Sequence, residues 1–271
     1  MSLQPSLVAV YDRFRPDRIR QRTGAKIFTS VWEYQTIPST STIAQELALA
    51  EPGGFHVVSA LEQTQGRGQH GRSWASAKGH GLLISLVMPK DRPWSRPSVW
   101  CAWCATALAD LVHHHTSLAP QIKWPNDILI QGRKVAGILV EQSAAVVAGI
   151  GLNVLPLPLS VDQPLWANAC ALGDFATPPP LLEEVAEGLL DRLETAWIMM
   201  ESGNFHDLEI HFSRGLGVEG RRAILETARE NLAGRIRSIR LGELCFEMES
   251  GAMRTFTPEE ILHIHPVHED F

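Results

Sequence analysis

The sequence has no long hydrophobic run and few cysteines. None of its apolar stretches approaches the ~20 residues that a membrane-spanning helix needs. The first twenty residues carry six charged side chains, so they lack the apolar core of a secretory signal. The four cysteines are too sparse for the disulfide framework of a small secreted domain, and we expect free thiols. These absences predict a cytoplasmic protein with no membrane partner.

An excess of positive charge is also absent. The 24 Lys and Arg residues stand against 30 Asp and Glu residues, which gives a net charge of -6. A protein that binds by neutralising the phosphates of a nucleic acid normally carries the opposite balance. We therefore expect no nucleic-acid partner.

The composition is that of an ordinary globular protein, with 45% hydrophobic and 20% charged residues in a chain of 271. This length allows one sizeable core and a small extra domain. Residues 1–24 mix Arg, Asp, Pro and Gln without periodicity, so we expect a loosely attached N-terminal arm, too short for a helix-turn-helix domain. A main domain over 25–204 and a small domain over 205–271 are expected to follow.

The main domain alternates short β-branched runs with amphipathic stretches. Strands are predicted over 26–34, 57–61, 82–88, 128–130, 135–140 and 146–150, and helices over 43–50, 99–115 and 179–200. The runs between residues 128 and 154 leave no room for crossover helices, so much of the sheet must be antiparallel. We predict an α+β fold. After residue 204, turn signals at short intervals predict a small C-terminal β-barrel of about 60 residues.

A glycine-rich segment over residues 63–74 reads QTQGRGQHGRSW. Its three glycines let backbone amides approach a ligand closely, and Arg67 and Arg72 offer planar forks suited to a carboxylate or phosphate. This pattern predicts an anion site. A mobile glycine loop with exposed arginines is the alternative if the segment is taken alone.

The glycine spacing also matches the GxGxxG dinucleotide fingerprint, which should open a helix. Residues 73–81 contain no helical stripe, and the next expected element is the strand from Leu82. No Gly-Lys-Ser/Thr follows, so the segment is not a phosphate-binding loop of the Walker A type either.

Three further segments place polar side chains among apolar strands. The segment KWPND at 123–127 contains a proline, which interrupts the hydrogen bonds between strands and turns the neighbouring side chains in new directions. The alternative interpretation of this segment is a solvated edge strand. KVAGILVE at 134–141 begins with a lysine, and Gly137 leaves space for a ligand or another backbone. GIGLNV at 149–154 ends a strand with small residues and an amide.

In this order and spacing, the four segments resemble the biotin–protein ligase family from about residue 36 to residue 154. The joint match is specific, because GRGxxGRxW, KWPND, KxxGILxE and GxGxNV are difficult to obtain together by chance. The resemblance implies a fold like that of class II aminoacyl-tRNA synthetases and biotin ligases, with a catalytic biotin- and ATP-binding domain over 25–204. The tail fits the family's small C-terminal domain of Src-homology-3-like (SH3-like) type.

The resemblance implies a two-step reaction. Biotin and ATP with Mg2+ give biotinyl-5'-AMP and pyrophosphate, and the biotinyl group then passes to a lysine of the biotin carboxyl carrier protein of acetyl-CoA carboxylase. Since no DNA-binding domain precedes the catalytic one, the repressor function of some family members is not expected. The sequence leaves open whether the chain forms a homodimer.

Site residues follow from the resemblance, position by position. The catalytic set is Lys134, Arg67 and Asp127, with Asp127 also the expected Mg2+ ligand. The biotin set is Ser39, Thr40, Ser41, Gln63, Gly66, Arg67, Gly68, Gln69, Lys134 and Gly137. The ATP and adenylate set is Arg67, Arg72, Trp74, Lys123, Asn126 and Asn153. Hydroxyls and an amide suit a ureido ring, and cations suit the charge that adenylation concentrates.

Two adenine contacts are expected within these sets. Trp74 is expected to stack on adenine and Asn153 to hydrogen-bond it, with a core role as the alternative for Trp74.

Two positions depart from the family's pattern. Ser41 stands where many members have Asn, which shortens a biotin contact, and Gln69 stands where many have Arg, which removes a charge near the adenylate. Separately, Cys101 and Cys104 form a CxxC on an apolar helix with no second CxxC, so we expect no zinc.

Two rival functions are compatible with parts of this pattern. A lipoate or octanoate ligase or transferase would need a pocket without the ureido-binding set of Ser39, Thr40 and Gln63. A non-catalytic biotin-binding protein would have no need to keep both Arg67 and Lys134. Both rivals are therefore less favoured than biotin activation.

Overall fold

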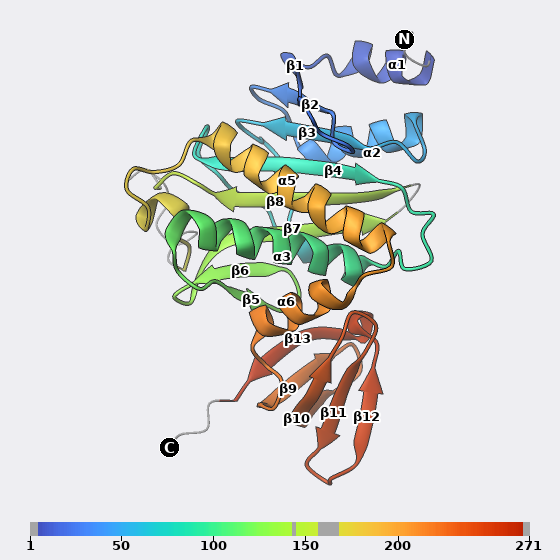
Figure 1. Ribbon diagram of the computed structural model, residues 1–271, viewed down its shortest axis with the longest axis vertical. Helices are drawn as coiled ribbons and strands as arrows, with labels where there is room; N and C mark the ends of the chain where they lie inside the picture. Colours follow the sequence, from blue (N-terminus) through green and yellow to red (C-terminus); the bar gives the residue numbers. More distant parts are fainter. Residues whose placement is uncertain (1–4, 143–144, 157–167, 268–271) are drawn as a thin grey trace.

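The computed structural model describes residues 5–142, 145–156 and 168–267. Two sheets organise these residues, an eight-stranded one and a five-stranded one (Figure 1). In sheet order, the large sheet comprises β1 (Arg18–Gln21), β2 (Ser30–Tyr34), β3 (His56–Ala60), β4 (Gly81–Met88), β8 (Val146–Asn153), β7 (Arg133–Gln142), β6 (Asp127–Ile130) and β5 (Gln121–Lys123). Among the described strands of this sheet, only β2 and β3 pair in parallel, so the expected mixed, largely antiparallel α+β fold is confirmed.

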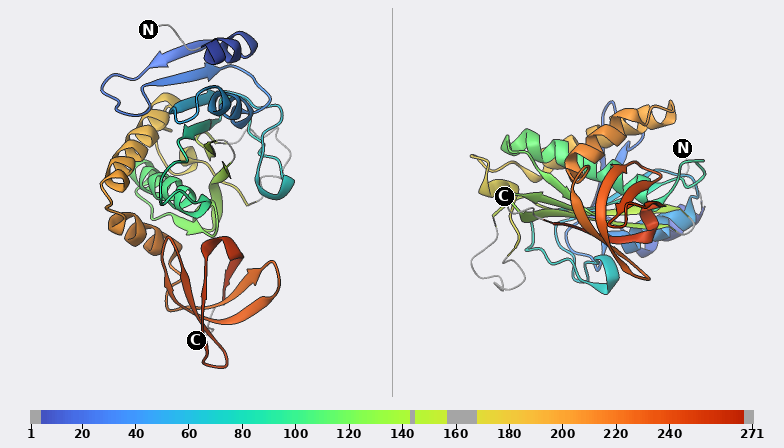
Figure 2. Two further views of the ribbon diagram at one scale, coloured as in Figure 1. Left: turned by 90° about the vertical axis from the view of Figure 1, so that its right-hand side faces the viewer. Right: turned by 90° about the horizontal axis from the view of Figure 1, so that it is seen from below.

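Helices cover both faces of the large sheet. The helix α2 (Thr40–Ala50) packs on one face, and α3 (Pro97–Thr116) and α5 (Leu182–Glu201) pack on the other (Figures 1 and 2). All eight residues of β4 are therefore buried. Beneath α3 and α5 lies an aromatic core in which Trp100 and Trp197 stack with ring centroids 5.5 Å apart. Cys104 is buried in the same core, which agrees with the expectation of a free thiol.

The described part of the N-terminal segment is attached firmly, and the expectation of a loose arm is wrong in this respect. After α1 (Pro5–Arg13), β1 extends the large sheet by pairing with β2. The side chain of Arg22 is only 2% exposed and lies 2.8 Å from Glu194, 2.7 Å from Glu187 and 2.7 Å from Asp191, all on α5. The attachment was missed because it depends on charges more than 160 residues away.

The C-terminal segment begins with a helix that sequence patterning missed. In α6 (His206–Leu216), Leu208, Phe212 and Leu216 are buried at a spacing of four residues, and the helix packs against α3 and β5. The short turn-rich pattern beyond residue 216 hid this helical stripe.

The second sheet follows α6. Its strands, in sheet order, are β12 (Met253–Phe256), β11 (Leu244–Met248), β10 (Asn231–Ile239), β9 (Arg222–Thr227) and β13 (Ile261–Pro266). All its pairs are antiparallel, and among the described residues β12 and β13 form its two edges without pairing to each other. A small β domain is confirmed, but no closed barrel is seen in this part of the chain. The domain boundaries at residues 25 and 205 stay predictions.

Within the described ranges, no helix combines the length and the apolar character needed to cross a bilayer.

Candidate functional site

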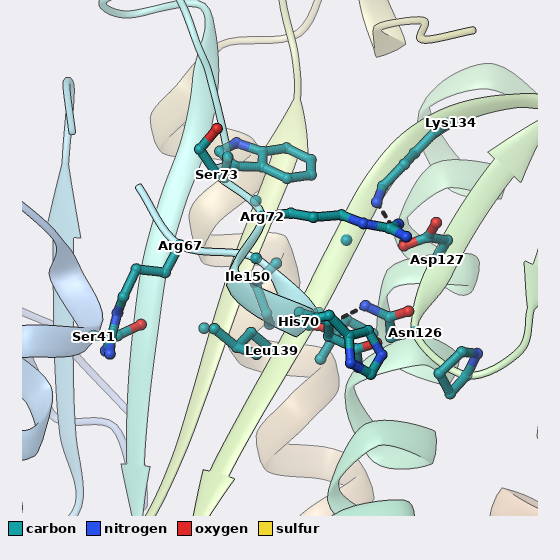
Figure 3. A pocket seen from close by; sticks show the side chains of 18 of the residues that line it. Ser41, Arg67, His70, Arg72, Ser73, Asn126, Asp127, Lys134, Leu139 and Ile150 are labelled. Atoms are coloured by element: carbon teal, nitrogen blue, oxygen red, sulfur yellow. Dashed lines mark hydrogen bonds and ion pairs between the residues drawn. The ribbon is translucent and has the colours of Figure 1, made fainter. Parts of the chain in front are cut away.

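A cavity of about 180 Å3 lies on the face of the large sheet that carries α2. Its walls come from the start of α2, the glycine loop over residues 66–74 and the adjacent strands β6, β7 and β8 (Figure 3). One residue of β13 also lines it. The sheet order explains this convergence, because β8, β7 and β6 lie side by side while α2 and the glycine loop lie over them. The cavity therefore joins all four segments that the sequence singled out.

A hydroxyl cluster forms the α2 end of the cavity. The Oε1 atom of Gln63 accepts hydrogen bonds from the backbone N–H of Thr40 at 2.7 Å and from its hydroxyl at 3.1 Å. Gln63 thus caps the start of α2 by accepting from the Thr40 N–H, and Ser39, the N-cap residue, makes no side-chain capping bond. This leaves the Ser39 hydroxyl and the amide nitrogen of Gln63 for a ligand.

Ser85 supports this cluster from below. Its buried hydroxyl lies 2.7 Å from that of Thr40 and 3.0 Å from that of Ser41, so the two residues of α2 are tied to β4. A Cβ added to Gly149 would lie 2.8 Å from the Ser41 hydroxyl, so Gly149 gives that hydroxyl its space. Sequence reasoning missed Ser85, although it is the one polar residue in the run from Leu82 to Met88.

The glycine loop is a short hairpin. Trp74 N donates to Gly66 O at 3.0 Å, and Gly68 N donates to Arg72 O at 2.7 Å. The tip is the 3-10 turn η1 (Gln69–Gly71), in which His70 has a φ of 54°. The loop therefore enters a strand pairing and not a helix, which removes the dinucleotide-fingerprint alternative.

Trp74 lies on a floor made of two glycines. Gly137 and Gly151 are register partners on β7 and β8. A Cβ on Gly151 would come within 2.3 Å of the indole, and one on Gly137 within 2.9 Å. The space that Gly137 was expected to leave for a ligand or another backbone is therefore taken by the Trp74 ring. The indole is half-buried, and its N–H has no partner among the described residues.

Lys134 and Asp127 form the charged pair at the centre of the site. The Lys134 ammonium lies 2.6 Å from a carboxylate oxygen of Asp127 and 5.4 Å from the ring centroid of Trp74. Asn126 is fixed beside them, because its side-chain amide nitrogen donates to Ile138 O at 2.8 Å and its backbone carbonyl oxygen accepts from Ile138 N at 2.9 Å. The Lys134 ammonium is thus held between Asp127 and the Trp74 ring.

The remaining cations of the site differ in how they are paired. Arg67 forms an ion pair of 3.0 Å with Glu141, and Figure 3 shows its side chain pointing away from Lys134. Arg72 points toward the side of the cavity where Asp127 and Lys134 lie (Figure 3). Neither Arg72 nor Lys123 forms an ion pair with any residue in the described ranges. The cavity therefore keeps two cations for an incoming anion.

Most of the expected site residues line this one cavity. Those that do are Ser39, Thr40, Ser41, Gln63, Arg67, Gly68, Gln69, Arg72, Trp74, Lys123, Asn126, Asp127, Lys134 and Gly137. Gly66 and Asn153 are not among its lining residues. Gly66 allows the hairpin to close, since an added Cβ would lie 2.3 Å from Trp74 O, and Asn153 is buried and donates to Cys170 O at 3.0 Å. Direct ligand contacts of these two residues stay predictions.

Sequence reasoning missed several lining residues. Ile138, Leu139 and Ile150 are apolar strand residues that give the cavity part of its wall. His70 stood inside the glycine segment and could have been noticed as a titratable residue at its tip. His263 belongs to β13, and no sequence signal links it to the site.

Cys101 lies against the KWPND segment of the site, and its thiol has a raised pKa. Burial, with a smaller effect of the Asp127 charge, raises the pKa of Cys101 to about 12. Its Sγ donates to Pro125 O at 3.0 Å, which helps to position the KWPND segment. A thiol that stays protonated cannot act as a covalent intermediate, so chemistry here relies on cations and hydrogen bonds.

Asp127 is the one carboxylate that lines the cavity, and the described residues contain no group of three metal-ligating side chains. This fits Mg2+ held by a single carboxylate together with the phosphates of a nucleotide, as Mg2+ is commonly bound, and does not fit an all-protein cage. The site can thus bind a small molecule with a polar head and a carboxylate beside a nucleotide.

Sequence comparison finds relatives that share these segments. The model of the biotin/lipoate A/B protein ligase family matches residues 33–154. A biotin--[acetyl-CoA-carboxylase] ligase of Mycobacterium tuberculosis is 32% identical over 83% of this chain and 86% of its own length. A bifunctional ligase/repressor BirA of Bacillus subtilis is 36% identical over 53% of this chain, which spans 46% of that longer relative.

Solved structures share the fold. The biotin protein ligase from Aquifex aeolicus in complex with biotin and ATP superposes with a TM-score of 0.74 at 20% identity, over 88% of this chain and 99% of that one. A biotin protein ligase from Leishmania major in complex with biotinyl-5-AMP gives a TM-score of 0.56 at 21% identity, over 84% and 98% of the two chains.

Proposed function

We infer that this chain, which belongs to the biotin–protein ligase family, activates biotin with ATP and transfers it to a lysine of an acceptor protein. The observation that carries the proposal is the joining of a hydroxyl-and-amide cluster and a group of cations in one cavity of about 180 Å3. The hydroxyl cluster suits a ring with donors and acceptors, and the cations suit a carboxylate beside a polyphosphate.

Biotin binds with its ureido ring at the α2 end of the cavity. The Ser39 hydroxyl and the amide nitrogen of Gln63 face the ring, because the carbonyl oxygen of Gln63 is already used by Thr40. The valeryl chain runs along the apolar wall formed by Leu139 and Ile150 toward Lys134. The carboxylate then lies beside the ammonium group.

ATP occupies the other end of the cavity. Adenine stacks on the exposed face of Trp74, whose opposite face rests on the two glycines. Arg72 and Lys123 face the phosphates, and Mg2+, when bound by Asp127 and phosphate oxygens, supplies further charge neutralisation there. Asn126 keeps this edge of the site in place through its two bonds to Ile138.

In the first step, a carboxylate oxygen of biotin attacks the α-phosphorus and the bond to pyrophosphate breaks. Lys134 stabilises the charge that develops around the α-phosphate, an effect typically worth ~2.7–4 kcal/mol for one preorganised donor. Arg67 exchanges its ion pair with Glu141 for the new anion. In the second step, the lysine amine of the acceptor attacks the acyl carbon, loses a proton and releases AMP.

Closure of the glycine loop protects the intermediate. Water would hydrolyse biotinyl-5'-AMP, and exclusion of water also strengthens the interactions of the cations with it. The hairpin tip over residues 69–71 is the part free to close, since its base is held by the bond from Trp74 N to Gly66 O.

The acceptor is the biotin carboxyl carrier protein of acetyl-CoA carboxylase, a proposal that the name of the Mycobacterium tuberculosis relative supports. A homodimer and a cytoplasmic location stay predictions, to be tested by light scattering and cell fractionation. We also propose that the chain does not bind DNA specifically, because its net charge is -6. A sequence-selective, salt-resistant complex in a gel-shift assay with biotin and ATP would contradict this.

The test of the function is transfer of labelled biotin to a carrier domain in the presence of ATP. We expect label on the carrier and none on a carrier whose acceptor lysine is changed to arginine. Lipoate and octanoate are offered in parallel reactions. Transfer of either acid in preference to biotin would identify the rival activity, and biotin binding without transfer would identify a non-catalytic protein.

A further inference from the structure

His263 is the one residue of the five-stranded sheet that lines the cavity, within the part of the chain that the structure describes. It lies on β13, the edge strand of that sheet nearest to the large domain (Figure 1). Its ring centroid is 6.5 Å from that of His70 at the tip of the glycine loop. Two imidazoles from segments almost 200 residues apart therefore meet over the cavity.

The position of His263 is fixed by contacts with the KWPND segment. Trp124, which is 7% exposed, donates its indole N–H to the carbonyl oxygen of Ile261 at 3.0 Å. Just before β13, Glu259 accepts a hydrogen bond of 2.6 Å from Ser98 on α3. These bonds hold the start of β13 against the large domain, and with it His263, which lines the same cavity as Lys123 and Asp127.

The charges around His263 favour an anion. Asp127 is neutralised by Lys134 and Glu141 by Arg67, whereas Arg72 and Lys123 have no ion pair with a described residue. Glu226, the register partner of His263 on β9, lies 3.1 Å from His265. A polyphosphate carries several negative charges, and an imidazole N–H is a suitable donor to phosphate oxygens.

We propose that His263 binds the β- and γ-phosphates of ATP, and hence the pyrophosphate leaving group, together with Arg72 and Lys123. The inference rests on the proposed function and adds a residue of the second sheet to the substrate-binding set. His263 makes no covalent bond in this scheme. It donates a hydrogen bond to the β- and γ-phosphates of ATP before biotin attacks the α-phosphorus, and to the released pyrophosphate afterwards.

The experiment compares the full-length protein with His263→Ala in biotin-dependent pyrophosphate exchange. We expect the KM values for ATP and for pyrophosphate to rise by at least ~10-fold, the loss expected for one hydrogen bond to a charged group. The dissociation constant for biotin, measured by calorimetry, should not change. His263→Lys keeps a cation at the site and should recover most of the affinity for both phosphates.

His265→Ala is the matched control, because His265 lies on the same strand, is bound to Glu226 and does not line the cavity. Circular dichroism checks the fold of every variant, and His263→Leu, which removes the donor but keeps a side chain of similar bulk, replaces His263→Ala if that variant is unstable. Unchanged KM values in a folded variant, or an equal rise in His265→Ala, would overturn the inference. If the wild-type protein itself shows no exchange, the proposed function fails instead.

Discussion

Lys134 and Asp127 face each other across β6 and β7, with the ammonium nitrogen 2.6 Å from a carboxylate oxygen. Side-chain exposures of 36% and 22% leave both groups accessible to a ligand. The same ammonium lies 5.4 Å from the centroid of the Trp74 ring. This arrangement fixes the lysine between the expected adenine site and the expected position of the biotin carboxylate, and it leads to the first prediction.

Lys134→Ala should chiefly impair adenylate formation and leave the fold intact, because the side chain is 36% exposed. Biotin-dependent pyrophosphate exchange should fall by at least ~100-fold, in line with the loss of one preorganised charge. Lys78→Ala, which breaks a surface pair of 3.5 Å with Glu62, is the control. Exchange near the wild-type rate in a folded Lys134→Ala protein would show that the active site has been misplaced.

Gln69→Arg should slow the release of biotinyl-5'-AMP. Gln69 lines the cavity where many family members carry arginine, and one charge-assisted hydrogen bond is worth ~1.5–3 kcal/mol. Release is measured by trapping free adenylate after a single turnover. Gln121→Arg adds the same charge at an exposed position outside the cavity. Equal release rates for the wild-type protein and Gln69→Arg would mean that residue 69 does not reach the intermediate.

Gly151→Ala should displace the Trp74 ring, since the added Cβ would lie 2.3 Å from it. We expect the affinity for ATP to fall by about ten-fold or more, the size of a lost stacking contact, while the affinity for biotin changes much less. Calorimetry with each ligand makes the comparison. Gly242→Ala is the control, because its new Cβ would meet no atom closer than 3.7 Å. An equal loss of both affinities would instead indicate general damage to the sheet.

The glycine loop should gain protection when the adenylate forms. We expect amide hydrogen exchange across residues 65–73 to slow when biotin and ATP are present. The slowing should be at least ten-fold at the tip, Gln69–Gly71. The amide of Trp74 should change little, because it is already bonded to Gly66. Exchange that is equally slow at the tip in both states would rule out a closing loop.

Arg22→Met should lower the free energy of unfolding by about 3 kcal/mol, because it leaves the buried carboxylate of Glu194 and the partly buried one of Glu187 without their cation. Arg13→Met, which breaks an exposed pair of 3.3 Å with Glu46, should cost less than about 1 kcal/mol. Urea denaturation of both variants gives the comparison. A loss below 1 kcal/mol for Arg22→Met would show that the N-terminal attachment contributes little.

The same cluster sets the sign of the pH dependence. Burial acts to raise the pKa of Glu194, but the backbone amides of Lys26 and Phe28 and the Arg22 guanidinium outweigh it and lower that pKa. The pKa of Glu187 is lowered in the same way by Arg22 and Arg20. Their stabilisation is therefore present above the unfolded pKa of about 4.3 and is lost as the pH falls below it. In Arg22→Met, acid unfolding should begin at a higher pH than in the wild-type protein.

Part of the fold could be read directly from the order of residues. The runs that became β3, β4, β7 and β8 are continuous and β-branched, and the helices α2, α3 and α5 begin at hydroxyl, proline or acidic signals. Such local patterns hold because burial of one face selects a period of two or 3.6 residues. The sequence pattern did not predict α1, β1, β5 and α6. These elements are short, or their few buried apolar residues are separated by polar ones.

The site divides in the same way. The sequence by itself supplied the candidate site, since the glycine loop, Lys134, Asp127 and the hydroxyls at the start of α2 stand in segments that resemble those of the biotin–protein ligase family. Only the tertiary structure decided that Trp74 fills the space over Gly137 and Gly151, that Arg67 is paired with Glu141, and that His263 reaches the cavity. These contacts join residues tens to nearly two hundred positions apart. They depend on strand register and sheet order, which long-range packing sets and local patterns do not record.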